Sequence, residues 1–218
     1  MAFKFNVTAD ELIRAATAVS QLGNTTGRQL QEAYKAIQDM SNVWIGNQYD
    51  KVSEATNKRT ANFNNTIKVL TNQLPSSMEK VAQTYAAADD EVCGSATFSE
   101  IVVVEDIVPK QHEATQIEFD ETQTQTYTEA FVKAVESAIQ SVETLSSKIP
   151  SYWLGFADDQ WRAQVKGIEN AIRGSANAVI ASINAQSQEA RLRLSGAEQS
   201  NIDLSDAVTG WLDALTYG

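Results

Sequence analysis

The stretch Asn42-Val43-Trp44-Ile45-Gly46-Asn47 interrupts a helical pattern of apolar residues that continues on both sides of it. Tyr152-Trp153-Leu154-Gly155-Phe156 interrupts a second such pattern in the other half of the chain. Glycine adopts backbone angles that other residues resist, so a Trp-x-Gly tripeptide suits a chain reversal. We expect each tryptophan to cover the open end of a helix pair with its large apolar surface. The two turns therefore indicate an internal duplication of a helix–turn–helix module.

Apolar residues recur at steps of three and four before the first turn, which is the signature of one buried helix face. Thr8-Ala9-Asp10-Glu11 predicts a capping box at the start of this helix, because each end residue can bond the backbone N–H of the other. Gly23 and Gly27 fall inside the pattern, and we expect a bend or a loosened turn there. The apolar positions are Leu12, Ala15, Ala16, Val19, Leu22, Leu30, Ala33, Tyr34, Ile37 and Met40.

The pattern resumes after the turn and continues through Pro75, which lacks an N–H and must kink the helix or begin a new one. We expect Gly94 to close this helix next to Cys93, so that the first module spans residues 1–93. Cys93, the single cysteine, is interpreted as an incidental thiol, with an intermolecular disulfide as the alternative. The apolar positions are Tyr49, Val52, Ala55, Phe63, Ile67, Leu70, Leu74, Met78, Val81 and Tyr85.

Residues 94–122 differ in kind and are predicted to form an acidic extended linker. They contain Pro109 and the β-branched run Ile101–Val104, which has strand propensity. A linker of about 27 residues, at about 3.3 Å each, can run the length of a long helix bundle. We therefore expect Ile101–Val104 to lie along a helix groove. His112, the only histidine, is interpreted as a solvated bystander.

The second module, residues 123–200, has helical patterns before Pro150 and after its turn. These patterns comprise Tyr127, Phe131, Ala134, Val135, Ala138, Val142 and Leu145, then Trp161, Val165, Ile168, Ile172, Val179, Ile183, Ala190 and Leu194. After Gly196, residues 201–218 are predicted to be an amphipathic tail, in which Asp203 or Ser205 caps a short helix. Its apolar face is a candidate partner-docking surface made of Leu204, Val208, Trp211, Leu212 and Leu215.

One long helical hairpin buries only one side of each helix, so its remaining apolar face must find another hairpin. The sequence therefore predicts an all-α fold in which two long helical hairpins form an elongated antiparallel four-helix bundle. An extended linker and a short C-terminal helix complete it. Antiparallel hairpins place their two turns at opposite ends, which accounts for the length of the linker.

Charge and hydropathy exclude several classes of protein. The 218 residues carry a net charge of −11, which repels phosphate backbones and anionic lipid surfaces, so we expect no nucleic-acid partner. No apolar run approaches the length that spans a bilayer. Residues 1–8 lack the apolar core of a secretory signal peptide, so we expect any export to follow another route.

The chain offers little catalytic chemistry, and we expect no catalytic residues, no metal and no cofactor. Cys93 and His112 are the residue types of a catalytic Cys–His pair, but nothing in the sequence orients one toward the other. Residues 23–27 begin and end with glycine but lack the lysine and the preceding strand of a phosphate-binding loop. The acidic clusters at residues 89–91 and 158–159 are interpreted as solvated groups or helix-dipole partners.

The pattern of helix, Trp-x-Gly turn and helix resembles the WXG superfamily, the ESAT-like small proteins of type VII secretion. With four tryptophans and ten glycines, chance predicts about 0.2 Trp-x-Gly matches, and both matches here fall between helical patterns. The turn residues that match are Trp44 and Gly46, then Trp153 and Gly155. Tyr85 and Asp89 match the family's export signal, a tyrosine followed four residues later by an acid. The second module matches the turn only.

This resemblance implies a fused pair of modules in a single chain, which we expect to be a monomer with intramolecular pairing. The first module corresponds to the signal-bearing partner, and the type VII membrane ATPase is the implied reader of its signal. The chain is then a virulence or interbacterial factor, exported folded to the cell surface or medium after cytoplasmic synthesis. The alternatives are an accessory or targeting partner of a larger co-secreted effector and a structural or membrane-interacting bundle.

Overall fold

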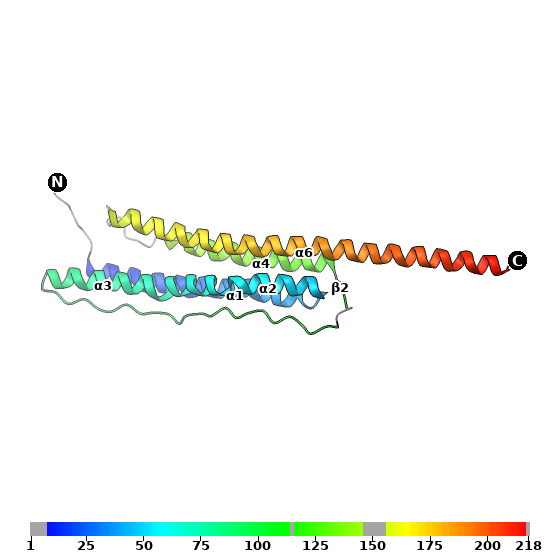
Figure 1. Cartoon of the computed structure of the whole chain (residues 1–218). Coiled ribbons are helices and arrows are strands. Elements are labelled where there is room, and N and C mark those ends of the chain that lie inside the picture. Colours follow the sequence, from blue (N-terminus) through cyan, green and yellow to red (C-terminus); the bar gives the residue numbers. More distant parts are fainter. Residues whose placement is uncertain (1–7, 114–115, 146–155, 217–218) are drawn as a thin grey trace.

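The computed structural model describes residues 8–113, 116–145 and 156–216, with side chains from Trp161 to Asp203 and at Ser205 in the last range. The fold is a mostly helical bundle, which confirms the predicted all-α class (Figure 1). The elements in chain order are α1 (Ala9–Met40), β1 (Trp44–Ile45), α2 (Asn47–Lys68), the π-helix η1 (Val69–Gln73), α3 (Leu74–Ala88), β2 (Glu118–Phe119), α4 (Glu121–Glu143) and α6 (Phe156–Thr216).

The first helix begins as predicted, with the capping box between Thr8 and Glu11 present in both directions. α1 then runs unbroken through Gly23 and Gly27, so the predicted loosened turn is wrong. A Cβ at Gly23 would lie 2.5 Å from the backbone nitrogen of Thr71, and one at Gly27 would lie 2.9 Å from Cβ of Val102. These glycines therefore allow close approach of neighbouring segments to α1.

The second long helical segment changes its geometry before Pro75. The π-helix η1 ends at Gln73, and Pro75 lies in the first turn of α3, where its missing N–H costs nothing. The N–H of Leu74 bonds the carbonyl of Val69, five residues back. The expectation that Pro75 kinks the helix or begins a new one is thus met by a new helix behind a π-turn.

The end of α3 differs from the prediction that Gly94 closes it. α3 ends at Ala88, and Asp90 adopts a positive φ of 55°. This lets the N–H of Glu91 bond the carbonyl of Ala86 at 2.8 Å. Aspartate is among the few non-glycine residues that enter this left-handed region readily, so the helix closes before the glycine is reached.

Two helices, α4 and α6, are described in the C-terminal half outside residues 146–155, and α6 is much longer than expected. α4 begins after Asp120, whose Oδ1 accepts from the N–H of Gln123 at 2.9 Å. α6 spans 61 residues, so the separate short C-terminal helix predicted after Gly196 is wrong. No proline interrupts this stretch, and one exposed glycine costs a helix only about 1 kcal/mol relative to alanine. The C-terminal part of α6 extends beyond the rest of the bundle (Figure 1).

Most buried apolar residues form one elongated core, and Leu12, Ile13 and Ala82 form a second, small cluster. α1 packs against α2, η1, α3 and α4, and α6 packs against α2 and α4. The largest fully buried side chains come from α1, the first turn, α2, η1, the α4 region and α6: Leu12, Leu30, Ile37, Met40, Trp44, Tyr49, Phe63, Ile67, Leu70, Phe131, Leu145 and Ile172. Figure 1 shows α4 and α6 on one side of the α1–α3 layer and the extended chain after α3 on the opposite side. The start of α4 lies beside β2, and α6 starts at the other end of the bundle.

Candidate functional site

Tyr85 and Asp89, the residues that match the export signal, lie together at the exposed end of α3. Ala82 and Ala86 of this helix are buried, with Ala82 packed on Leu12 of α1. Tyr85 is 37% exposed, and Asp89 is an exposed cap residue directly after the helix. Both side chains are therefore accessible from outside the bundle.

The first Trp-x-Gly turn is more than a chain reversal. Trp44 is 1% exposed, and its ring lies 5.1 Å from that of Phe119 and 6.1 Å from that of Tyr49, between ring centroids. β1 pairs antiparallel with β2, with Trp44 opposite Phe119. Gly46 has a φ of +129°, and a Cβ there would lie 3.1 Å from the carbonyl oxygen of Gln116. The turn thus binds the end of the linker as well as reversing the chain.

The side chains of two groups of predicted site residues lie outside the part of the chain that the structure describes. Trp153 and Gly155 of the second turn lie outside the described residues. The tail positions lie on the backbone of α6, and their side chains are outside the described set; they are Leu204, Val208, Trp211, Leu212 and Leu215.

Sequence reasoning missed a set of polar contacts that holds residues 96–113 against α1 and α2. We call this extended segment the strap. Asn64 donates to the carbonyl of Val104 at 2.9 Å and accepts its N–H at 2.8 Å. Asn57 does the same to Ile107, at 2.9 and 2.8 Å. Each carboxamide therefore satisfies both main-chain groups of one strap residue, as a neighbouring strand would in a sheet.

The first helix supplies the other wall of this groove. Gln38 bonds both main-chain groups of Val108, at 3.0 and 2.9 Å. Nearer the start of the strap, Thr17 Oγ1 accepts the N–H of Thr97 and Asn24 donates to the carbonyl of Glu100, at 3.1 and 2.7 Å. The strap consequently runs parallel to α1 and antiparallel to α2.

Few strap side chains enter the core. Val104 and Ile107 are 1% and 4% exposed, whereas Ile101 and Val103 are 38% and 57% exposed. The expectation that residues 101–104 lie along a helix groove is therefore met at Val104 and at half-buried Val102. Main-chain bonds to polar side chains, more than apolar burial, hold the strap in place.

His112 ends the strap with a paired side chain, which corrects its interpretation as a solvated bystander. Its Nε2 lies 2.8 Å from Oδ2 of Asp50, its Nδ1 lies 2.9 Å from the carbonyl oxygen of Glu113, and the side chain is 10% exposed. Both partners can only accept, so the imidazolium form fits both contacts. The Glu113 carbonyl and the Asp50 carboxylate raise the pKa of His112 above its ordinary value. Cys93 packs near Leu12, at the other end of the extended chain.

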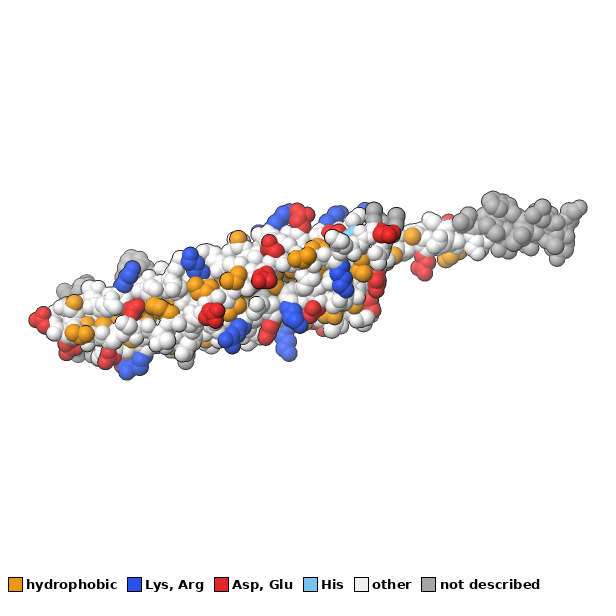
Figure 2. Space-filling model, turned by 90° about the horizontal axis from the view of Figure 1, so that it is seen from below, with side chains coloured by type: hydrophobic (Ala, Val, Ile, Leu, Met, Phe, Trp, Pro, Cys, Tyr) orange, Lys and Arg blue, Asp and Glu red, His pale blue; other side chains and the backbone are white. Residues whose placement is uncertain are grey.

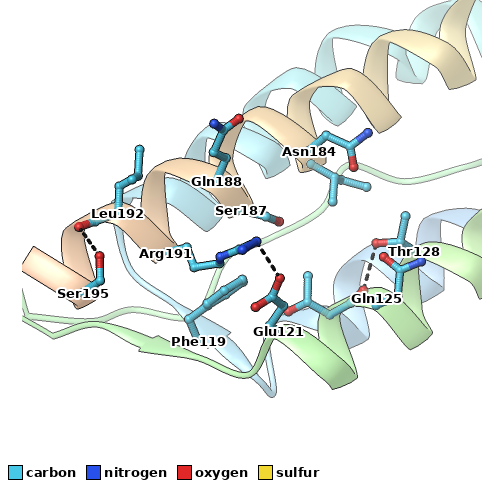
Figure 3. A pocket seen from close by; sticks show the side chains of 12 residues that line it. Phe119, Glu121, Gln125, Thr128, Asn184, Ser187, Gln188, Arg191, Leu192 and Ser195 are labelled. Carbon is cyan, nitrogen blue, oxygen red and sulfur yellow. Dashed lines mark hydrogen bonds and ion pairs between the residues drawn. The ribbon is translucent and has the colours of Figure 1, made fainter.

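A polar hollow of about 450 Å³ lies between the start of α4 and the middle of α6 (Figure 3). Arg191 reaches from α6 to Glu121 of α4, with 3.1 Å between Nη1 and Oε1. Gln125 and Thr128 face it from α4, and Asn184 and Gln188 face it from α6. The ion pair and the uncharged amides and hydroxyls supply no nucleophile–base arrangement of the kind that catalysis uses.

The described residues include no cluster of three or more side chains suited to hold a metal ion. Among the described helices, none is both long and apolar enough to cross a bilayer. No family model, curated protein or solved structure matches the chain. A functional assignment therefore depends on the residues themselves and on their geometry.

Proposed function

We propose that the chain is a non-enzymatic, tandem WXG-type protein and a self-paired substrate of a type VII secretion system. The observation that carries this proposal is the position of Tyr85 and Asp89. Both are exposed at the outer end of α3, the helix that follows the first Trp-x-Gly turn through α2 and η1. A membrane ATPase that reads a tyrosine and an acid at this spacing has access to them without unfolding the bundle.

The proposed architecture is two helical hairpins joined as an antiparallel four-helix bundle. The first hairpin is α1 with α2, η1 and α3, and the second is α4 with α6. Contacts of α1 with α4, and of α2 with α6, support pairing between the hairpins within one chain. Because each hairpin covers the apolar face of the other, the chain needs no separate partner to travel folded.

A secretion assay in the native host tests the export proposal. We compare culture medium and lysate for the wild type, Tyr85→Ala, Asp89→Asn and the control Asp90→Asn. Asp90→Asn removes the neighbouring charge, and asparagine tolerates the positive φ at this position. The expected result is that Tyr85→Ala and Asp89→Asn stay in the lysate, folded by circular dichroism, while Asp90→Asn is exported. Export of all four chains, or of none, would contradict the proposal.

The second candidate function is an adaptor for a larger secreted effector, and the extension of α6 beyond the bundle favours it (Figure 1). On a helix, positions 204, 208, 211, 212 and 215 share one face. Leu212→Asp places a charge on this face far from Tyr85. If the adaptor function is right, Leu212→Asp leaves this chain in the medium but removes a second protein from it. An unchanged set of exported proteins contradicts the adaptor function.

A further inference from the structure

We propose that the groove between α1 and α2 is a peptide-binding site, and that the strap is its displaceable resident. The ligand class is an extended segment of another polypeptide with aliphatic residues at the positions of Val102, Val104 and Ile107 and an acid at that of Asp106. This goes beyond export, because it assigns a binding activity to the folded bundle.

Recognition begins with the main chain. Asn57 and Asn64 are seven residues apart on α2, a rise of about 10.5 Å along a helix. Their partners Ile107 and Val104 are three residues apart, which is about 10 Å in an extended chain. The two carboxamides are thus spaced to bond the main chain of two residues that lie three positions apart in an extended chain. These bonds do not depend on the side chains of that chain.

Specificity comes from a few side-chain positions. A Cβ at Gly27 would lie 2.9 Å from Cβ of Val102, so this glycine leaves the space that a branched side chain occupies. Val104 and Ile107 are buried. Thr60 Oγ1 donates to Oδ1 of Asp106 at 2.6 Å, which favours a side chain with an oxygen acceptor, such as an acid, beside the second buried position.

The strap buries fewer apolar side chains than the long helices beside it. Four of its apolar side chains face solvent: Phe98, Ile101, Val103 and Val108. Figure 2 views the molecule from the side on which the strap lies in Figure 1, and apolar side chains form an interrupted row along this face. With few buried side chains and many solvent-accessible polar bonds, the strap belongs among the segments that open at low free energy.

The covalent connection explains why the groove is filled by the chain itself. A tethered segment acts at an effective concentration of about 1 mM, so it excludes a free peptide of moderate affinity. If the strap sequence binds the groove with an intrinsic Kd of about 10 μM, this competition weakens the apparent binding of a free peptide about 100-fold. A partner segment displaces the strap when it binds more tightly or is itself tethered nearby.

The test uses a full-length chain in which residues 96–108 are replaced by glycine and serine in equal number. The probe is a fluorescein-labelled synthetic peptide of residues 95–110, and fluorescence anisotropy measures its binding. We expect saturable binding that weakens at least about 10-fold with Asn57→Ala/Asn64→Ala in the protein or with Val104→Asp/Ile107→Asp in the peptide. The unaltered chain should bind the peptide about 100-fold more weakly than the chain with the replaced strap.

Absence of binding to the replaced chain at 1 mM peptide, with its helical content retained, overturns the proposal. So does binding that is equal in the unaltered chain or insensitive to Asn57 and Asn64, because the peptide then occupies another surface. If the replaced chain does not fold, a dye attached through Val103→Cys in a Cys93→Ser chain reports displacement directly. Unlabelled peptide must then change the dye signal in a dose-dependent way that a scrambled peptide does not reproduce, and an unchanged signal overturns the proposal.

Discussion

Ser20 Oγ donates a 2.6 Å hydrogen bond to the main-chain carbonyl of Thr71, four residues before Pro75. A proline has no N–H to donate to the carbonyl four residues earlier in a helix, and the Ser20 hydroxyl supplies a donor to that carbonyl. The same hydroxyl accepts the N–H of Ser99 at 2.8 Å. The hydroxyl of Ser20 on α1 therefore bonds both a carbonyl of the π-helix before Pro75 and an N–H near the start of the strap.

Ser20→Ala should destabilise the fold by about 1–3 kcal/mol, because it removes one hydrogen bond from a buried carbonyl and one from a strap N–H. Urea denaturation monitored by circular dichroism measures the loss. Ser77→Ala is the control, since Ser77 is an exposed α3 residue whose hydroxyl bonds only its own helix at the carbonyl of Gln73. Equal stability of the two variants contradicts the role assigned to Ser20.

Gly23→Ala should destabilise the protein by about 1–3 kcal/mol, because the new Cβ overlaps the backbone of η1. Gly174→Ala should change the free energy of unfolding in the opposite direction. Gly174 lies on α6 with open space around its Cβ position, so alanine should stabilise the helix there by about 0.5–1 kcal/mol. Thermal denaturation of both variants checks the pair, and a stabilising Gly23→Ala contradicts the close approach of α1 to η1.

Trp44→Ala should cost about 3–5 kcal/mol, because it removes a large, fully buried side chain from between Tyr49 and Phe119. The melting temperature should therefore fall. Because Trp44 also packs against Phe119 of β2, the pairing of β1 with β2 should loosen as well. Amide hydrogen exchange of Asp120, whose N–H bonds the carbonyl of Val43 at 2.9 Å beside the Trp44–Phe119 pair, measures that pairing. Leu192→Ala is a control at a 62% exposed position and should change stability by less than about 0.5 kcal/mol. An unchanged melting temperature for Trp44→Ala refutes the packing role.

The contact between His112 and Asp50 should stabilise the fold at low pH more than at high pH. Because the pKa of His112 is raised in the folded state, its contribution is fully present below the unfolded-state pKa and is lost as pH rises through the folded-state pKa. The stability difference between wild type and His112→Gln should therefore be larger at pH 5.5 than at pH 9. Urea denaturation at both pH values measures it. A difference that grows with pH would show that the neutral imidazole makes the contact.

Local sequence patterns predicted the helices because their causes are local. The capping box at Thr8 and the spacing of apolar residues along α1 each involve neighbours within one or two turns. The same locality explains two errors. Asp90 closed α3 ahead of Gly94 through its own backbone conformation, and helix-forming residues carried α6 through Gly196. At both places the sequence held one signal for ending the helix and another for a different end or for continuing it. The sequence pattern did not show which of the two was stronger.

The candidate export site was visible in the sequence because Tyr85 and Asp89 are four residues apart. The extended course of residues 94–122 was also predicted, but the side chains that hold the strap were not, because Asn57, Asn64 and Gln38 bond residues 40 to 70 positions away. A surface asparagine in a helix looks the same whether it bonds water or another segment. The spacing of Asn57 and Asn64 on one helix face was the available signal, but it became informative only once an extended chain lay opposite.

The sequence by itself determined that this protein is helical, where its first turn lies and which faces are apolar, since these follow from periodicity and from residues close together in the chain. Only the tertiary structure decided which segments meet. It placed Thr71 against Gly23, Val102 against Gly27 and His112 against Asp50. Such contacts depend on the packing of the whole bundle, and the free energy that selects them is a sum over many distant pairs that no local pattern records.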